Sequence, residues 1–219
     1  LQLKVDNGGY ILETDESNNI VSIPISVIVP DLQPGNFQSL SVGIGGRTLQ
    51  FSYNTTNNGP SEIIGGGRWL WTDQLFLSED AVWDTADLPV SQINQLPQTI
   101  LPGEFFGRTN SFTMPVRPSG NYYLILRADY YGSANHGDLY ETDESNNQLI
   151  IPIQLTTPDL SPIQLAAPAE ASTRQPVQLA WSIQNIGDGI AQKKQTYLAS
   201  EWSDRLYLST NSKVNAASI

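Results

Sequence analysis

The segment GRTLQFSYNTTNNG, Gly46–Gly59, gives the clearest structural signal in the chain. Leu49, Phe51 and Tyr53 alternate with the polar residues between them, so that one face of the segment is apolar and the other is polar. Successive side chains of a β-strand point to opposite faces, and this period of two therefore predicts a half-buried strand. The Asn58-Gly59 pair at its end is a strong turn signal, and we expect the chain to reverse there.

Similar segments follow along the chain, and no long window shows the 3.6-residue period of a helix. About seven short strands separated by turn signals are typical of an antiparallel sandwich of the immunoglobulin type. We therefore predict an all-β fold class, an immunoglobulin-like antiparallel β-sandwich. The other strand segments are WLWTDQLFLS (69–78), NSFTMPV (110–116), GNYYLILRADYY (120–131) and NNQLIIPIQL (146–155).

Two residue types make this prediction more specific. Tyr122 follows Gly120-Asn121 at the start of a strongly apolar strand, which is the setting of a tyrosine corner, where the hydroxyl bonds back to nearby backbone. Pro152, like Pro24 at the equivalent position of an earlier segment, cannot donate a hydrogen bond to a β-ladder. The last strand should therefore be an edge strand, or carry a bulge, at this proline.

The acidic stretch ETDESNN occurs twice, at Glu13–Asn19 and at Glu141–Asn147, and an Ile-Pro-Ile triplet follows each copy. The second copy lies 128 positions after the first, and the same offset places Pro158-Asp159-Leu160 on Pro30-Asp31-Leu32. A repeat of this length matches a whole small domain. The sequence therefore predicts tandem immunoglobulin-like antiparallel β-sandwich modules rather than one large fold.

The phase of the repeat predicts three parts. Residues 1–30 should form the C-terminal part of a preceding repeat, 31–158 a complete immunoglobulin-like repeat, and 159–219 the N-terminal part of a following repeat. We expect the sequence to be an excerpt from a longer protein. Because only two threonines separate the closing strand of the complete repeat from Pro158, adjacent modules should hold a limited range of angles.

Composition excludes several classes of function. The chain carries 22 acidic and 11 basic residues, a net charge of -11, whereas nucleic-acid binding needs a basic face. It has no cysteine, which excludes disulfides and thiolate metal sites. The longest apolar run, residues 20–29, is too short and too interrupted to span a bilayer. We therefore expect no nucleic-acid partner and no membrane insertion of this segment.

The acidic turn has two interpretations. In the mechanical one, Asp and Ser side chains bond to nearby backbone, Asn tolerates left-handed conformations, and together they reverse the chain between the last two strands. In the other, its carboxylates supply the hard oxygen ligands that calcium requires, although the stretch is not an EF-hand. The first interpretation requires no cofactor. The second makes calcium an optional ligand of Asp129, Glu141, Asp143 and Glu144 and, in the first copy, of Glu13, Asp15 and Glu16.

The sequence lacks the usual signatures of catalysis. His136 is the only histidine, and it has no counterpart in the first repeat portion. Neither a Gly-x-Ser-x-Gly elbow nor a His-Glu-x-x-His motif occurs. A carboxylate pair for glycoside hydrolysis could be picked from 22 acids by choice alone, so its presence proves nothing. We therefore predict no catalytic residues, and a protein that is not an enzyme.

The second acidic turn also carries a family resemblance. YETDESNNQLIIPI (140–153), preceded by YYLILRADYY (122–131) and by LPGE (101–104), resembles the cell-adhesion-related domain of bacteria called CARDB. The motifs Trp71-x-Asp73 and Trp202-x-Asp204 are similar to the opening half of such modules. The resemblance implies an immunoglobulin-like sandwich, an extracellular or cell-surface location, and a role in adhesion or spacing. It implies no catalytic site.

Two functions are left open. The first is a non-enzymatic adhesion or structural repeat that acts as a spacer, stalk or fibre module. Its partners would be neighbouring repeats, head-to-tail copies of the chain, and cell-surface glycans or proteins. The alternative is a carbohydrate-binding module of a secreted multidomain protein, in which Trp83, Tyr123, Tyr130 and Tyr131 stack on sugar rings. Repetition favours the first function, because Asn-Gly replaces the aromatic pair at 130–131 in the opening portion.

Overall fold

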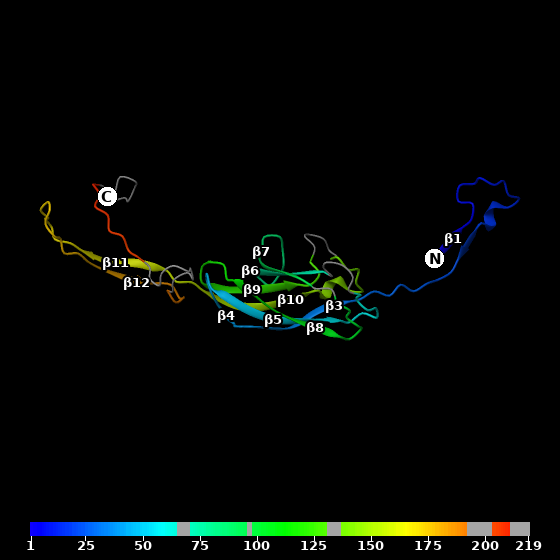
Figure 1. The fold of residues 1–219 in the computed structure, drawn as a ribbon, viewed down its shortest axis with the longest axis horizontal. Coiled ribbons are helices and arrows are strands. Elements are labelled where there is room, and N and C mark those ends of the chain that lie inside the picture. The colour runs from blue at the N-terminus through cyan, green and yellow to red at the C-terminus, as the bar shows by residue number, and fades with distance from the viewer. Residues whose placement is uncertain (65–70, 96–97, 131–136, 192–202, 211–219) are drawn as a thin grey trace.

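The computed structural model describes residues 1–64, 71–95, 98–130, 137–191 and 203–210. Figure 1 shows a central β-sandwich that is preceded by one two-stranded hairpin and followed by another. Within the described residues, helical structure is limited to two short 3-10 turns, and none of it is long and apolar enough to cross a membrane. The predicted all-β class is therefore confirmed.

Two sheets pack face to face in the central unit. The strand order is β4-β10-β9-β6-β7 in the larger sheet and β3-β5-β8 in the smaller one. Neighbouring strands are antiparallel, except for the parallel pair β4 and β10. This is the immunoglobulin-like sandwich that the strand pattern predicts. The bounds are β3 (Leu32–Ser39), β4 (Val42–Ile44), β5 (Thr48–Asn57), β6 (Thr72–Ser78), β7 (Leu88–Asn94), β8 (Phe105–Thr113), β9 (Gly120–Arg127) and β10 (Gln148–Thr156).

The core lies between the two sheets and contains the inward-facing side chains of β5 and β9. Leu49, Phe51 and Tyr53 of β5 are buried, as their alternation predicts. Leu124 and Leu126 of β9 belong to the same cluster and are completely buried. Burial of each such side chain stabilises the fold by about 1.5–3 kcal/mol. The period-two pattern therefore decides which face of each strand turns inward.

Two local predictions are confirmed. The Tyr122 hydroxyl donates to the Pro118 carbonyl oxygen at 3.1 Å, which forms the tyrosine corner. Pro152 lies in β10 before this strand meets β4, whose pairing begins at Gln154. The Gln154 N–H donates to the Ser41 carbonyl on the β4 side. Because residues two apart in a strand face the same way, Pro152 turns its nitrogen toward the unpaired part of this edge.

The N-terminal hairpin repeats the geometry of β9 and β10. Leu3 pairs with Val21 in the antiparallel ladder of this hairpin. Leu126 and Leu149, which hold the equivalent positions of the repeat, pair in the same way. The hairpin elements are β1 (Gln2–Lys4), the 3-10 turn η1 (Glu16–Asn18) and β2 (Ile20–Ser22).

An aspartate in a left-handed backbone conformation follows the first strand of both hairpins. Asp6, with φ 41°, accepts hydrogen bonds from the N–H groups of Tyr10 and Ile11, each at 2.9 Å. Asp129, with φ 47°, accepts from the N–H groups of the two equivalent residues, again at 2.9 Å. The repeated sequence thus forms the same hydrogen bonds in two different surroundings. The limits 1–30, 31–158 and 159–219 themselves stay predictions.

After the central unit, β11 (Leu160–Ala166) and β12 (Ala180–Asn185) form an antiparallel pair. They hold the repeat positions of β3 and β5, and the β11–β12 ladder, like that of β3 and β5, contains an irregularity. Tyr131, His136 and Trp202, which the sequence analysis singled out, lie outside the described residues.

Candidate functional site: the acidic turn and its surroundings

The acidic turn of the central unit is a 3-10 turn, η2 (Glu144–Asn146), that leads directly into β10. Asp143 caps it, because its Oδ1 accepts hydrogen bonds from the Ser145 N–H at 2.8 Å and from the Ser145 hydroxyl at 2.6 Å. These two bonds stabilise the carboxylate and hold the pKa of Asp143 below its usual value. In the first copy, Asp15 and Ser17 form the same two bonds at the same distances. The cap is therefore a local property of the sequence.

Glu141 behaves differently from its counterpart Glu13. Its side chain is half-buried, and its Oε1 accepts a hydrogen bond from the Asn147 amide at 3.0 Å. Its Oε2 accepts from the backbone N–H of Leu32, a residue 109 positions earlier in the chain. Burial is the main cause that raises the pKa of Glu141 to about 8. Glu13 is exposed, so the two copies share a sequence but differ in their surroundings.

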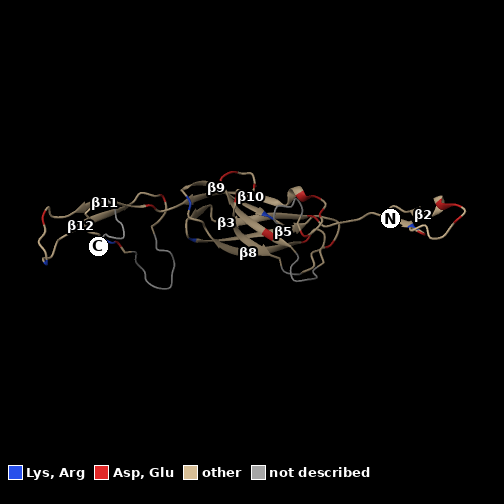
Figure 2. Ribbon diagram, turned by 90° about the horizontal axis from the view of Figure 1, so that it is seen from above, with Lys and Arg blue, Asp and Glu red and all other residues tan. Residues whose placement is uncertain are grey.

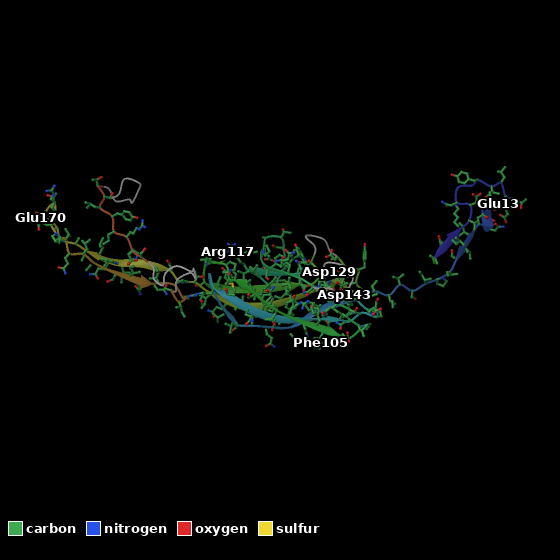
Figure 3. All side chains as sticks on the ribbon, viewed as in Figure 1. Glu13, Phe105, Arg117, Asp129, Asp143 and Glu170 are labelled. Carbon is green, nitrogen blue, oxygen red and sulfur yellow. The ribbon has the colours of Figure 1, made fainter. Side chains whose placement is uncertain are left out.

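Two neighbours of Glu141 reach the same segment. The Thr142 N–H donates to the Pro30 carbonyl oxygen at 3.0 Å. The Asn146 side-chain amide donates to Asp31 Oδ1, also at 3.0 Å. The turn therefore contacts the three residues at which the chain enters the sandwich. Figure 3 places Asp129 and Asp143 at this end of the sandwich, whereas Glu13 lies in the N-terminal hairpin.

Asn57, at the end of β5, holds the other side of this segment. Its Oδ1 accepts from the Asp31 N–H at 3.2 Å and from the Gly59 N–H at 3.1 Å. Asn185 repeats both bonds, to Asp159 at 3.0 Å and to Gly187 at 3.2 Å. The sequence analysis assigned these asparagines no role. The signal that could have found them is the recurrence of Asn and Gly at a fixed spacing.

A buried carboxylate, Asp73, lies nearby at the start of β6. Its two oxygens accept four hydrogen bonds, and no charged donor is among them. The donors are the Trp71 indole N–H (2.7 Å), the Tyr53 hydroxyl (2.6 Å), the Asp129 backbone N–H (3.1 Å) and the Gln95 side-chain amide. Burial raises the pKa of Asp73 to about 6, and it has the same effect on Asp129. In the next repeat portion the Trp181 indole donates to Asp204 at 3.0 Å, so an indole N–H takes the place of the Tyr53 hydroxyl.

Most of the carboxylates proposed for calcium accept hydrogen bonds from N–H and O–H groups of the protein. Both Asp129 oxygens accept hydrogen bonds from backbone N–H groups, and the carboxylates of Asp143 and Glu141 accept the hydrogen bonds described above. In the first copy, Asp15 accepts from Ser17, and Glu16 accepts from Glu13 and Asn19. Within the described ranges, no group of three or more His, Cys, Asp and Glu side chains is placed to hold a metal ion. Calcium binding at these residues stays a prediction.

Two of the aromatic residues considered for carbohydrate binding, Trp83 and Tyr130, pack with Phe76 on the outer face of the larger sheet. Phe76, Trp83 and Tyr130 form edge-to-face contacts, with ring centroids 5.3–5.9 Å apart. The Arg127 guanidinium lies over Trp83, 4.0 Å from the ring centroid, and 5.1 Å from that of Tyr130. A sugar ring would have to displace this guanidinium in order to stack on the same face of Trp83. Tyr123 lies on β9, the strand that also carries Arg127, and is half-buried.

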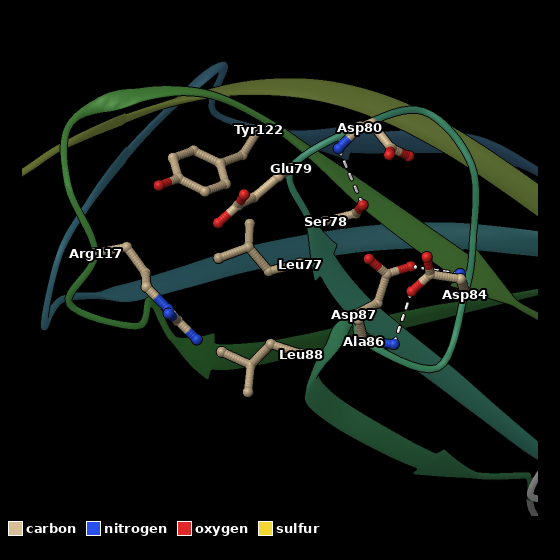
Figure 4. A pocket seen from close by; sticks show the side chains of 10 residues that line it. All are labelled: Leu77, Ser78, Glu79, Asp80, Asp84, Ala86, Asp87, Leu88, Arg117 and Tyr122. Carbon is tan, nitrogen blue, oxygen red and sulfur yellow. Dashed lines mark hydrogen bonds between the residues drawn. The ribbon is translucent and has the colours of Figure 1, made fainter.

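A hollow of about 310 Å³ lies between the β6–β7 loop and the segment before β9 (Figure 4). Aspartate side chains that line the hollow accept hydrogen bonds from backbone N–H groups of the same loop. Asp80 accepts from the Val82 N–H at 2.8 Å, and Asp84 accepts from the Ala86 N–H at 2.7 Å. Asp87 likewise accepts from the Asp84 N–H at 2.9 Å. These bonds are those of turn-forming aspartates. Figure 2 shows that most acidic residues of the described chain lie in such loops and turns.

Comparison with solved structures finds partial matches at low identity. The CARDB domain of the PF1109 protein from Pyrococcus furiosus, in complex with di-metal ions, is 13% identical, and the match covers 60% of this chain and 97% of that one at a TM-score of 0.41. A solution structure of the same domain is 14% identical, covers 59% and 97%, and has the same TM-score. A β-glucosidase from Listeria innocua in complex with glucose is 8% identical, covers 57% of this chain and 16% of that one, and has a TM-score of 0.36.

No family model and no curated protein sequence matches the chain. The metal ions and the glucose are features of those other proteins. At these identities the likeness concerns the fold alone, and the assignment to the immunoglobulin-like class rests on the strand order of the chain itself. CARDB domains are thus among its structural neighbours.

Proposed function

We propose that the chain is part of a non-enzymatic, extracellular repeat protein of the CARDB kind, in which each sandwich acts as a spacer or stalk module in an adhesion structure. The observation that carries this proposal is the repeated junction. Asp31, Asn57 and Gly59 form the same hydrogen bonds as Asp159, Asn185 and Gly187, at points where the chain passes into a new set of strands. A spacer needs such a joint at every step, whereas a binding protein with a single ligand does not.

The surroundings of the candidate groups support the same proposal. Asp73, Asp80 and Asp84 are used in hydrogen bonds that hold the fold together. Partners would be neighbouring repeats, including head-to-tail copies, and molecules of a cell surface. A carbohydrate-binding role finds less support, because Arg127 covers the Trp83 ring.

Two measurements test the proposal. Small-angle scattering of the 219-residue chain should report an elongated particle whose maximum dimension changes little between low and high salt. Antibodies against the same chain should stain intact cells of the source organism without permeabilisation. A compact particle, or staining only after permeabilisation, would overturn the spacer or the location. Specific binding of the chain to a defined sugar on a glycan array, lost on Trp83→Ala, would favour the carbohydrate-binding alternative.

A further inference from the structure

Leu32 is the first residue of β3, and its backbone N–H needs a partner because the residue is completely buried. Its neighbour across the sheet is Asn57 of β5. The Asn57 backbone is already occupied, since its N–H donates to Glu104 at 2.9 Å and its carbonyl accepts from Gly103 at 2.7 Å. The ladder therefore offers Leu32 no acceptor at this position. Glu141 Oε2 supplies it from the opposite end of the module sequence.

The segment Pro30–Leu32 is held on two sides. On one side lie the three bonds from the acidic turn, through Glu141, Thr142 and Asn146. On the other side lies Gly59, where an added Cβ would be 2.6 Å from the Asp31 nitrogen and 2.7 Å from the Pro30 Cα. No side chain larger than that of glycine fits there without moving the segment. Every residue of Pro30-Asp31-Leu32 is thus in contact with the module that follows.

We propose that the acidic turn ETDESNN of a complete module is a clamp for the incoming linker: the copy at Glu141–Asn147 binds the Pro-Asp-Leu segment at the start of its own module and so sets the direction from which the preceding module arrives. This inference deepens the proposed spacer function and rests on it. The chemical complementarity is specific. The glutamate oxygen accepts from the leucine N–H, the threonine N–H donates to the proline carbonyl, and the first of the two asparagines donates to the aspartate.

The clamp explains why the acidic stretch and the Pro-Asp-Leu segment recur at the same offset. Pro158-Asp159-Leu160 repeats the linker. Both sequences are needed once per module if one binds the other. A turn that only reversed the chain would need the cap formed by Asp143 and Ser145 but would have no use for Glu141, which reaches across 109 positions.

Amide hydrogen exchange in the 219-residue chain tests the clamp at a single N–H group. Glu141→Ala should speed the exchange of the Leu32 amide by about tenfold or more, because the group loses its acceptor, while the amides of β9 keep their protection. The matched control is Glu13→Ala, which changes the same residue of the same motif where no linker is bound. It should leave the exchange of Leu32 unchanged.

A second pair of variants covers the case in which Glu141→Ala does not fold. Asn146→Ala should increase the backbone motion of Asp31 in ¹⁵N relaxation, whereas Asn18→Ala, its counterpart in the first copy, should not. The clamp is overturned if Leu32 stays protected in Glu141→Ala, if all amides accelerate equally, or if Asp31 is unmoved in Asn146→Ala. None of these results would affect the elongated particle that scattering should report, so failure of the clamp is distinguishable from failure of the spacer function.

Discussion

At the scale of single residues, Asp73 and Asp204 hold the same position of the repeat in different surroundings. Asp73 is completely buried and accepts four hydrogen bonds, including one from the backbone of Asp129. Asp204, its counterpart, is exposed and accepts from the Trp181 indole. A buried carboxylate with neutral donors is costly to desolvate, yet it is costlier to remove, because its donors would be left without an acceptor.

Asp73→Ala should lower the free energy of unfolding by about 3–5 kcal/mol, since four buried donors lose their acceptor at once. Asp73→Asn should cost less, about 1–3 kcal/mol, because one oxygen remains. Urea unfolding followed by tryptophan fluorescence measures both. The matched control, Asp204→Asn, should change stability by less than about 0.5 kcal/mol because the site is exposed. An equal effect at the two positions would contradict the role assigned to Asp73.

Stability should fall as pH rises from about 4 to about 8. Burial raises the pKa of Asp73 and of Asp129 to about 6 and that of Glu141 to about 8, above their values in an unfolded chain. Between about pH 4 and about pH 8 the folded protein therefore binds more protons than the unfolded one, so a rise in pH favours unfolding. The urea midpoint should therefore be higher at pH 5 than at pH 8. Glu141→Gln should flatten the upper part of the profile and Glu13→Gln should not; a midpoint that climbs with pH would refute this assignment.

Calcium should leave the melting temperature within about 1 °C of its value in chelator, because the carboxylates of the acidic turn already accept hydrogen bonds from the protein. Calorimetry of the 219-residue chain in calcium and in chelator measures this. A rise of several degrees in calcium that disappears in Asp143→Asn would show instead that the turn binds the ion.

At the scale of elements, the larger sheet has two tryptophans in contrasting positions. Trp71, before β6, packs edge-on against Phe106 and donates its indole N–H to Asp73. Trp83, in the β6–β7 loop, packs on the outer face of the sheet, and its buried indole N–H has no hydrogen-bond partner among the described residues. Both rings pack against neighbouring aromatic side chains, but among the described residues only the Trp71 indole N–H finds an acceptor.

Trp71→Phe should therefore cost about 2 kcal/mol, from the lost bond to a buried carboxylate together with the space left by the smaller ring. Trp83→Phe should cost less than about 1 kcal/mol, since it keeps the ring contact and removes a donor that has no acceptor within the described part of the chain. Thermal unfolding of the two variants side by side measures the difference. Equal destabilisation would mean that ring volume, not the indole N–H, decides both positions.

At the scale of the whole molecule, the junction after the central unit is held from both sides. The Thr157 hydroxyl donates to the Arg117 carbonyl at 2.6 Å, and the Thr157 N–H donates to Ser119 Oγ at 3.0 Å. From the next portion, Gly189 donates to the Thr157 carbonyl at 3.2 Å. A Cβ at Gly187 would lie 2.5 Å from the Asp159 nitrogen. The short linker is therefore packed between the two portions rather than free.

Gly187→Ala should broaden or displace the distribution of distances between the central unit and the repeat portion that follows it. The chain has no cysteine, so nitroxide labels at Gln50→Cys and Gln175→Cys would be unique, and both sites are exposed. Pulsed electron spin resonance should give a narrow distance distribution in the parent chain and a broader or displaced one in Gly187→Ala. Gly107→Ala is the control, because a Cβ there would meet its nearest atom at 3.7 Å. A broad distribution in the parent chain would show that the junction is flexible.

Much of this architecture could be predicted from local patterns. The alternation of Leu49, Phe51 and Tyr53, the tyrosine corner and the open edge at Pro152 follow from strand period and backbone chemistry. The cap formed by Asp143 and Ser145 also needs only neighbouring residues, which explains why Asp15 and Ser17 reproduce it in a separate hairpin. Such features depend on contacts within a few residues, and the sequence by itself determined them, together with the repeat.

Only the tertiary structure decided what the repeated acidic turn touches. Glu141 and Glu13 stand in identical heptapeptides, yet only Glu141 is part-buried and bonded to Leu32. No local rule predicts a bond across 109 positions, because it depends on how the sheets bring the last strand beside the first. The acidic turn occurs twice in the sequence, but the packing of the two sheets decides that the second copy contacts the segment Pro30–Leu32. The physical reason is that the buried N–H of Leu32 needs an acceptor, and the fold places Glu141 beside it.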